Sequence, residues 1–259
     1  MKIVSLDASF ESIFWQNVNQ DIPHYYFYAF DWKHNREKTE ILLVLENKRI
    51  DGMMLVYDKR IVQLRGSSKA AEVFLQGLDL EKVELQSLKE HKQLVLKKYR
   101  PTLRQSDEMM LMLLHKGEER PRIVHPALAL DASNSEKIAD MMRDADPEYG
   151  GDVKGQGIAE GMGNGVKWFG VNVNNELVSI GSLRLTEWIG LVSVVATQET
   201  HRNQGYATSV VSILVRHILE RLPLAMIFVL ADNAPAIQTY TKVGFRPYRT
   251  YFFMRGEKR

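Results

Sequence analysis

The stretch from Val192 to Ala207 constrains the fold of this chain more than any other. It begins with a β-branched segment up to Thr197 and continues through a polar turn that contains Gly205. The residues that follow have apolar side chains at helical spacing, at Val210, Ile213, Leu214 and Ile218. This succession predicts a strand, a turn and a helix. Because the first turn of a helix has unpaired N–H groups at the positive end of the helix dipole, the turn is suited to an anion.

The residue types in this turn fit a phosphate group. Gly205 lets the backbone approach a ligand closely, Ala207 keeps the next position small, and Arg202 adds a positive charge. A strand, a glycine turn and a helix also occur in many proteins that bind nothing there. These residues alone therefore leave both interpretations open.

Composition is that of a globular protein. The 259 residues allow one large or two medium domains, and 45% hydrophobic with 25% charged residues argues against disorder. The 34 basic and 32 acidic side chains leave a net charge of +2, so neither nucleic acid nor an anionic membrane surface is an expected partner. With no long apolar run and no signal peptide at the N-terminus, we expect a cytoplasmic protein.

Cysteine is absent, which excludes disulfides, thiolate metal sites and cysteine nucleophiles. The seven histidines are scattered without the spacing of metal ligands. We therefore expect no metal site.

The first half of the chain predicts a hairpin, a strand, a helix, a strand, a helix and a strand. A short helix and an aromatic cluster that we interpret as core precede them. In order the ranges are Phe10–Val18, Tyr25–Trp32, Ile41–Leu45 with Arg49–Val56, Arg60–Leu64, Ser68–Leu78, Lys82–Leu88, Glu90–Tyr99 and Met109–His115. The turn before the Ser68 helix has no arginine, so Ser67 or Ser68 is expected to be a plain helix N-cap.

A charged segment with a proline, Gly117–Arg122, is the expected linker, which gives domains 1–120 and 121–259. The stretch Asp146–Gly165 holds seven of the 17 glycines and is predicted to be a long mobile loop. The remaining elements of the second half are expected at Ser135–Asp144, Val166–Val173 with Leu177–Thr186, Gly190–Thr197, Tyr206–Arg221, Ala225–Leu230, Ala234–Val243 and Phe245–Arg255.

The second half repeats the order of the first. Gly52 and Gly181 stand at like places after the two hairpin turns. Two copies of one fold are therefore predicted, and the first copy lacks the anion-binding turn.

A second group of residues follows the buried strand. Asn233 follows the predicted strand Ala225–Leu230, and its side-chain amide can both donate and accept hydrogen bonds. Tyr240 lies about two helical turns further on. A helix N-cap with a packing tyrosine would explain both residues without any ligand.

Together the two stretches resemble the GNAT superfamily of N-acetyltransferases. The cofactor motif of that family corresponds to Arg202-Asn203-Gln204-Gly205-Tyr206-Ala207. Its later motif corresponds to Asn233, Ala236, Tyr240, Gly244 and Phe245. The resemblance covers roughly Arg122–Arg255 and departs from the common pattern at Glu199, where proline is frequent.

The resemblance implies an α+β or α/β fold with two tandem GNAT-like domains, each a mixed, mostly antiparallel sheet flanked by helices. It implies acetyl-CoA, or another short acyl-CoA, as co-substrate, held between two strands that separate. An N–H near Val195 would meet the thioester carbonyl. The implied cofactor contacts are Val194, Val195, Ala196, Thr197, Arg202, Asn203, Gln204, Gly205, Tyr206, Ala207, Thr208, Asn233, Ala236 and Tyr240.

The implied reaction is N-acetylation of a primary amine, of the EC 2.3.1 type, by direct attack in a ternary complex. Tyr240 matches the general-acid position of the family, and Glu187 is the candidate base, although a glutamate in a surface turn needs no such role. The expected acceptor is a small molecule, with a first domain that covers the active site or supports a homodimer. Two alternatives stay open: acetylation of a peptide N-terminus or lysine, and a module that senses acyl-CoA without turnover.

Overall fold

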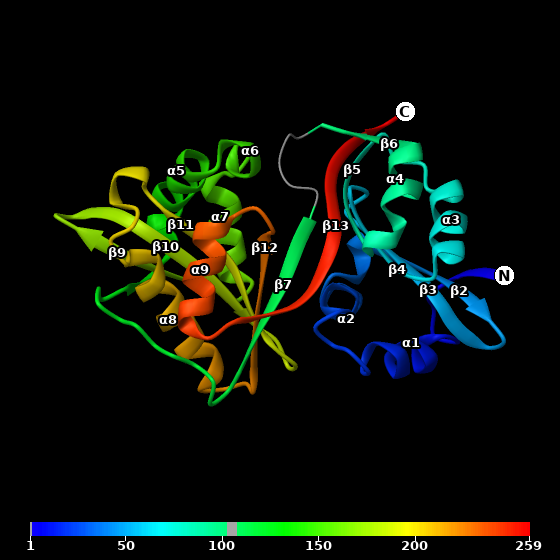
Figure 1. Ribbon diagram of the computed structural model, residues 1–259, viewed down its shortest axis with the longest axis horizontal. Helices are drawn as coiled ribbons and strands as arrows, with labels where there is room; N and C mark the ends of the chain where they lie inside the picture. The colour runs from blue at the N-terminus through cyan, green and yellow to red at the C-terminus, as the bar shows by residue number, and fades with distance from the viewer. Residues whose placement is uncertain (1, 103–107) are drawn as a thin grey trace. The chain divides into compact units, whose positions relative to one another are not determined.

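The computed structural model describes residues 2–102 and 108–259, and its contacts divide the chain into two compact units (Figure 1). The first comprises Met1–Met110, Leu230–Asp232 and Arg249–Arg259, and the second comprises Leu111–Val229 and Asn233–Tyr248. A single boundary at residue 120 would assign the end of the chain to the second unit. The contacts instead assign Arg249–Arg259 to the first, because the last strand pairs with a strand of that unit.

The first unit is built on a sheet with the strand order β1-β2-β3-β4-β5-β13. Neighbouring strands are antiparallel except β4 and β5, which are parallel. The strands are β1 (Lys2–Ser5), β2 (Thr39–Glu46), β3 (Arg49–Tyr57), β4 (Ile61–Gly66), β5 (Lys82–Ser87) and β13 (Arg246–Lys258), and β6 (Tyr99–Pro101) pairs with β13. The helices are α1 (Glu11–Val18), α2 (Tyr26–His34), α3 (Ser68–Gly77) and α4 (Lys92–Lys98).

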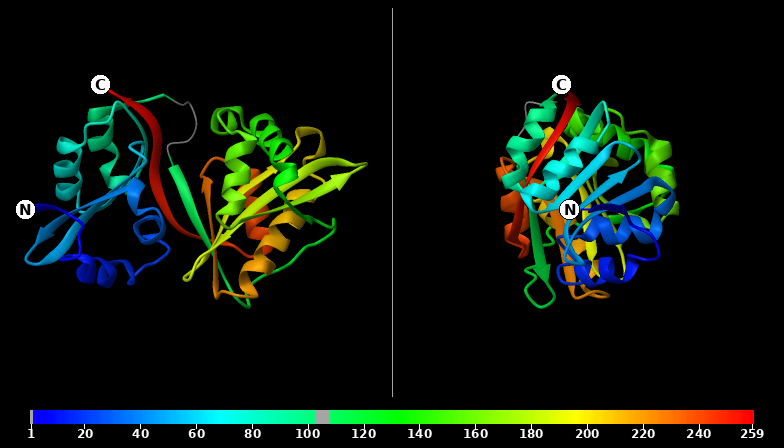
Figure 2. Two further views of the ribbon diagram at one scale, coloured as in Figure 1. Left: turned by 180° about the vertical axis from the view of Figure 1, so that it is seen from behind. Right: turned by 90° about the vertical axis from the view of Figure 1, so that its right-hand side faces the viewer.

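The second unit has the strand order β7-β12-β11-β10-β9-β8, in which β11 and β12 are parallel and the strands from β8 to β11 are antiparallel. Its strands are β7 (Glu108–His115), β8 (Leu128–Leu130), β9 (Val166–Val173), β10 (Glu176–Leu185), β11 (Gly190–Thr197) and β12 (Leu224–Leu230). Its helices are α5 (Ser135–Ala145), α6 (Pro147–Gly150), α7 (Gly155–Gly163), α8 (Tyr206–Leu219) and α9 (Ala234–Val243) (Figure 2). The predicted fold class, a mixed and mostly antiparallel sheet flanked by helices in each half, is confirmed.

Two glycines set the same close packing of a helix on each sheet. A Cβ added to Gly52 would lie 2.5 Å from Cβ of Ala70 on α3, and one added to Gly181 would lie 2.6 Å from Cγ1 of Val210 on α8. Both distances are shorter than van der Waals contact, so neither position accepts a larger side chain without a shift. The predicted equivalence of these glycines is confirmed.

The prediction of a mobile loop over Asp146–Gly165 is wrong, because this stretch forms the helices α6 and α7. Its glycines allow close packing. A Cβ on Gly150 would lie 2.4 Å from the carbonyl oxygen of Met142, and one on Gly155 would lie 2.3 Å from the carboxyl group of Glu136, both on α5. Tertiary contacts therefore outweigh the poor helix propensity of glycine here.

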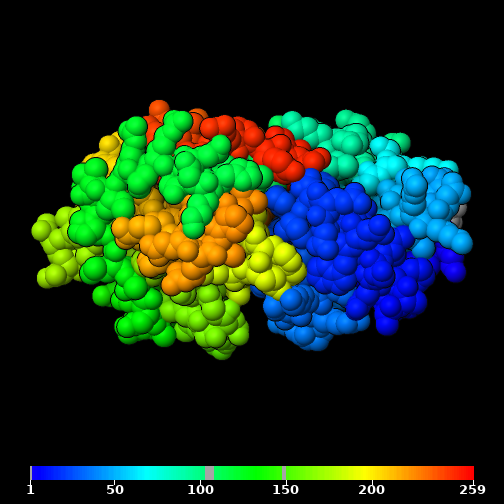
Figure 3. Space-filling model, turned by 90° about the horizontal axis from the view of Figure 1, so that it is seen from below, coloured from blue at the N-terminus to red at the C-terminus, as the bar shows by residue number. Residues whose placement is uncertain are grey.

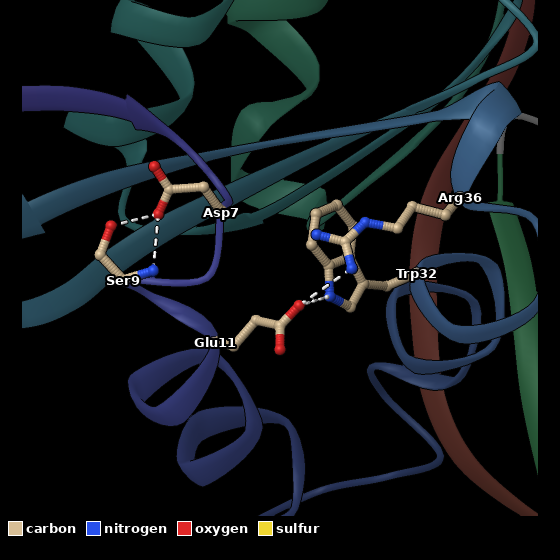
Figure 4. Close-up of polar contacts among 5 residues, drawn as sticks. All are labelled: Asp7, Ser9, Glu11, Trp32 and Arg36. Atoms are coloured by element: carbon tan, nitrogen blue, oxygen red, sulfur yellow. Dashed lines mark hydrogen bonds and ion pairs between the residues drawn. The ribbon is translucent and has the colours of Figure 1, made fainter.

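Helices α1 and α2 of the first unit are joined by a polar cluster (Figure 4). The carboxylate of Glu11 accepts hydrogen bonds from Trp32 Nε1 at 3.2 Å and from Arg36 Nη1 at 3.1 Å. The guanidinium carbon of Arg36 lies 4.0 Å from the centre of the Trp32 ring, and Asp7 accepts from the backbone N–H of Ser9 before α1 begins. The aromatic run predicted as core forms α2, whose buried residues are Tyr26, Tyr28, Ala29, Asp31 and Trp32.

Two searches over residues 2–102 and 108–259 gave no candidate. None of the described helices combines the length and apolar character needed to cross a lipid bilayer. Among the same residues, no three His, Asp or Glu side chains lie where they could hold a metal ion together.

Candidate acyl-CoA site in the second unit

Strands β11 and β12 pair along only part of their length. Their parallel register runs from Gly190 opposite Ala225 to Val192 opposite Ile227. On the other side of β11, Leu183 pairs with Val192 and Ser182 with Val194, which leaves Ser193 as an extra, bulged residue. Because a bulge bends the strand that carries it, β11 turns away from β12 at this point.

The separated part of β11 is half-buried and lies between two groups of helices. Val194 and Ala196 pack on the apolar cluster formed with α5 and α7. Val195 pairs with Gly181, the residue that contacts α8, so it faces the opposite side of the sheet. In the described part of the chain, the edge of Val194–Thr197 that would face β12 has no strand partner. This edge is an open slot for an extended ligand.

The slot ends at the turn before α8. Gly205 is the N-cap of α8 and has a φ of +85°, while Asn203 has a φ of +63°. No side chain of the described residues caps the helix, and a Cβ added to Gly205 would meet nothing within 4 Å. The N–H groups of the first turn, including those of Tyr206 and Ala207, therefore point into open space at the positive end of a 14-residue helix.

Arg202 lies beside this helix end and is exposed. Its Nε donates to the carbonyl oxygen of Thr197 across 3.4 Å. The turn therefore has the free N–H groups and the neighbouring guanidinium that the sequence predicted, and the structure adds the left-handed conformation of Gly205.

A segment that the sequence analysis missed holds the first turn of α8 in place. Ser209 Oγ accepts from the backbone N–H groups of Val124 and His125, each at 3.1 Å, and Ser212 Oγ accepts from the N–H of Arg122 at 3.0 Å. His125 Nε2 lies 2.9 Å from the carbonyl oxygen of Gln204. Figure 3 shows this segment (green) against α8 (orange). Two serines three residues apart in an apolar helix were the available sequence signal.

The second predicted group lies at the start of α9 and within it. Asn233 is the N-cap of α9, since its Oδ1 accepts from the N–H of Ala236 at 3.2 Å. The side chain is exposed, so its amide nitrogen still faces solvent. Asn233 therefore does serve as a helix cap, and the same amide can donate to a ligand.

Tyr240 is 6% exposed and packs edge-on against Phe245 with ring centres 6.2 Å apart. Burial raises the pKa of Tyr240 to about 12. Its phenol is therefore protonated throughout the neutral range and can act only as a proton donor there.

Glu187 lies in the bend between β10 and β11 and is exposed. It precedes the paired end of β11, and Val195 is five residues beyond Gly190, or roughly 16 Å along the strand. The separation of the strands therefore begins well beyond Glu187, and its role as a base stays a prediction.

A hollow of about 300 Å³ lies beside Gln198, which follows the end of β11 that leads to the turn before α8. It is bordered by α5, by the turn between β9 and β10, and by Gln198. Asp140, Asp144 and Glu176 outnumber the single cation, Lys137, along its walls. The hollow is therefore suited to a cationic group.

The corresponding place in the first unit is closed. Strands β4 and β5 stay paired from Ile61 and Glu84 to Leu64 and Ser87. Arg65, which is 1% exposed, follows directly. Its Nη1 donates to the carbonyl oxygens of Leu64 at 3.0 Å and Gln86 at 3.4 Å, and its Nη2 donates to the side-chain oxygens of Gln63 and Gln86. The guanidinium thus bridges the ends of the two strands.

The helix that follows β4 is also capped. Ser67 Oγ accepts from the N–H of Ala70 at 3.1 Å, which confirms the predicted N-cap. The first unit therefore has the same succession of elements, with the strand ends bridged by Arg65 and with a capped helix.

This architecture defines a tandem GNAT-like fold, with the separated strand pair in the second unit. Residues 170–254 match the family model described as FR47-like protein. Across 72 residues the chain is 39% identical to a mycothiol acetyltransferase of Streptomyces bingchenggensis. That match spans 27% of this chain and only 23% of the length of the relative.

Solved structures share the fold at low sequence identity. An acetyltransferase of the GNAT family from Colwellia psychrerythraea matches with a TM-score of 0.59 and 13% identity, covering 100% of both chains. A tandem GNAT protein from the clavulanic acid biosynthesis pathway matches with a TM-score of 0.51 and 12% identity, covering 85% of this chain and 82% of that one. These matches confirm the predicted tandem fold.

Proposed function

We propose that the second unit is an acetyl-CoA-dependent N-acetyltransferase that acts on a primary amine. One observation carries this proposal: the open edge of β11 leads directly to the uncapped N-terminus of α8. An extended chain bearing a pyrophosphate has the shape and charge for this surface, because strand-edge groups bind amides and helix N-termini bind phosphate.

Each part of the cofactor has candidate partners. The pyrophosphate lies on the N–H groups of Asn203 to Ala207 with Arg202 beside it. The pantetheine amides pair with the edge of Val194–Thr197, and the exposed amide of Asn233 reaches the same chain. Bound acetyl-CoA supplies the acyl group as a thioester, and an N–H near Val195 stabilises negative charge on its carbonyl oxygen.

Two proton transfers accompany the reaction, which proceeds by direct attack of the amine in a ternary complex. The buried phenol of Tyr240 gives a proton to the departing thiolate. Glu187 is the candidate that receives the proton of the amine, and a chain of water molecules has to carry that proton, because Glu187 lies at the paired end of β11, roughly 16 Å or more from Val195.

Calorimetric and thermal-shift titrations with acetyl-CoA test the proposal. Saturation at about 100 times Kd stabilises a protein by about 2.7 kcal/mol, so a rise in Tm of roughly 5 to 10 °C is expected. Gly205→Glu should abolish binding, because it adds a negative charge and a side chain where the phosphate lies.

Gly165→Glu is the matched control. Gly165 has a φ of +86° and nothing within 4 Å of an added Cβ, so it carries the same backbone strain as Gly205 without facing α8. This variant should bind acetyl-CoA as the wild type does. Absence of any acetyl-CoA binding by the wild type would remove the proposal.

The alternative acceptor is a lysine or the N-terminus of a peptide. A screen by thiol release should compare small amines with a lysine-containing peptide. Turnover of the peptide alone would replace the small-molecule acceptor, and binding of acetyl-CoA without turnover of any amine would favour a sensing module.

The first unit is proposed to bind no acyl-CoA. Arg65 occupies the strand ends that would have to separate, and Ser67 occupies the N-terminus that would bind phosphate. A stoichiometry of one acetyl-CoA per chain in the same titration is the expected result.

A further inference from the structure

Among the described residues of the second unit, two buried polar atoms have no hydrogen-bond partner: Oγ of Ser182 and Nε1 of Trp168. Ser182 is 1% exposed and Trp168 is 4% exposed. The two residues pair across β9 and β10, and Ser182 pairs in turn with Val194 on β11. Side chains at paired positions lie on the same face of a sheet with Cβ atoms roughly 5 Å apart. The two residues are therefore neighbours on one face of the sheet.

This row of side chains ends at the slot. Val194 adjoins the bulge at Ser193, where β11 turns away from β12. Neighbouring strands are about 4.8 Å apart, so Ser182 is one strand spacing and Trp168 two from the start of the separated edge. Ser182 therefore lies one strand away from the edge proposed to bind the thioester, and Trp168 lies one strand further.

The chemistry of the pair specifies what it binds. An indole N–H only donates, and a hydroxyl can donate as well. Trp168 belongs to an apolar cluster with Ile138, Ile158 and Ile180. A buried donor in apolar surroundings is unfavourable until it meets an acceptor, and such surroundings favour a neutral acceptor over a charged one. A carbonyl oxygen meets these conditions.

We propose that Ser182 and Trp168 form a subsite for a carbonyl oxygen of the acceptor, which makes the acceptor an amine of the amino-acid amide type. This inference rests on the proposed acetyltransferase function. Ser182 and Trp168 are specificity-determining residues for the acceptor, and neither takes part in the transfer of the acetyl group.

Helix α7 is the element that must move to admit this group. It packs Ile158 and Met162 on the cluster that contains Trp168. Four of its nine residues are glycine, which gives it low intrinsic helix stability. An element of low stability can open without unfolding the unit.

The test compares two amines that differ only in a carboxamide: L-leucinamide and 3-methylbutylamine. Thiol release is measured with the full chain at saturating acetyl-CoA. Because the carboxamide also lowers the pKa of the amine, kcat/KM is expressed per neutral amine, and two hydrogen bonds to the carbonyl oxygen predict that this value is roughly tenfold to a hundredfold higher for leucinamide. Ser182→Ala and Trp168→Phe should each lower this preference several-fold by raising KM for leucinamide, with little change for 3-methylbutylamine.

Ser179→Ala is the matched control. Ser179 is a fully buried serine on the same strand, but its hydroxyl is bonded to the carbonyl oxygen of Ala196 at 3.2 Å and to Oγ1 of Thr197 at 2.8 Å. It pairs with Thr197, two positions from the Gly181–Val195 pair, and so lies on the face toward α8. This variant should keep the preference for leucinamide.

Equal kcat/KM values for the two amines in the wild type overturn the subsite, as does a preference that both Ser182→Ala and Trp168→Phe retain. A water molecule held permanently by the Ser182 hydroxyl and the Trp168 indole would leave the preference unchanged in both variants, and this result also overturns the subsite. L-leucylglycine distinguishes the source of the carbonyl: faster acetylation of this dipeptide than of leucinamide supports the subsite and assigns it to peptide amino termini.

The inference and the proposed function fail separately. A chain that binds no acetyl-CoA contradicts the function. The subsite is then measured by saturation-transfer NMR of the two amines without cofactor, where equal binding of leucinamide and 3-methylbutylamine overturns it.

Discussion

Burial of Tyr240 in the fold sets the protonation state that the proposed chemistry requires. The phenol is almost completely enclosed, so it is kept neutral well above the physiological range. A neutral phenol already carries the proton that it donates. A departing thiolate needs such a donor.

Tyr240→Phe should lower kcat by about a hundredfold, the lower end of the effect of a general acid, and leave acetyl-CoA binding nearly unchanged. The pKa of about 12 also predicts that the wild-type rate does not fall between pH 8 and 10 through ionisation of this group. Thiol-release assays at several pH values measure the kcat of the variant and the pH dependence of the wild-type rate. Tyr248→Phe, at an exposed tyrosine, is the control, and an unchanged kcat in Tyr240→Phe would exclude the role.

His24 in the first unit gives a prediction for stability. Burial, helped by the charges of Arg65 and Arg249, lowers the pKa of His24 to about 2, and its Nδ1 lies 2.7 Å from the hydroxyl of Tyr251. The folded chain therefore leaves His24 neutral, while the unfolded chain protonates it below about pH 6.5. Stability should fall as the pH falls below 6.5, by up to about 1.4 kcal/mol per pH unit.

Urea unfolding at pH 6.5 and pH 4.5 measures this loss. His24→Gln removes the titrating group and should flatten the dependence, whereas His115→Gln, at an exposed histidine, should not. Equal slopes for His24→Gln and the wild type would show that His24 does not control the loss.

At the scale of the element, α7 is the helix whose stability we expect to limit access to the slot. Gly157 is exposed, and a Cβ added to it would meet nothing within 4 Å. Gly157→Ala should therefore stabilise α7 by up to about 1 kcal/mol and raise Tm by roughly 2 to 4 °C. It should also lower kcat/KM for the amine, because α7 must open to admit the acceptor.

Gly77→Ala, at an exposed glycine of α3 with equally open surroundings, is the control for Gly157→Ala. It should raise stability without changing KM for the amine. Stabilisation of α7 with an unchanged kcat/KM would mean that acceptors enter by another route.

Local patterns predicted the elements whose own residues determine them. The hairpin around Asn47 and Lys48 and the one around Asn174 and Asn175 are set by left-handed turn residues, and α8 is set by its apolar spacing. Helix α7 was missed because the contacts that fix it come from α5, which no local pattern of Gly155–Gly163 reveals.

The candidate site divides in the same way. The turn at Arg202–Ala207 is a local motif, and its uncapped helix N-terminus was predicted from the sequence. The unpartnered groups of Trp168 and Ser182 become visible only when β9, β10 and β11 are aligned, since neither residue type is unusual in a strand. The part of the candidate site that the sequence did not predict therefore depends on pairing between strands that are distant in the sequence.

At the scale of the whole molecule, the end of the chain completes the first unit. Residues Phe252 to Glu257 of β13 pair with β5, and Lys258 bonds Asp79 through a surface ion pair. A fragment of residues 1–110 lacks this strand and leaves the edge of β5 unpaired.

Fragment 1–110 should therefore be unfolded or aggregated, as judged by circular dichroism and gel filtration. The same fragment joined through a flexible linker to residues 249–259 should fold cooperatively. Cooperative unfolding of the shorter fragment alone would show that β13 is dispensable for the first unit.

The guanidinium of Arg65 bears on how a duplicated domain can evolve. Arg65 and Val194 occupy matching positions, each opposite the residue that follows the buried glycine of its hairpin. A copy released from selection for catalysis loses the ligand that would satisfy its strand ends, and one arginine at this position replaces those hydrogen bonds from within the chain. Loss of a ligand can thus be neutral for folding, which allows a copy without that ligand to keep the fold.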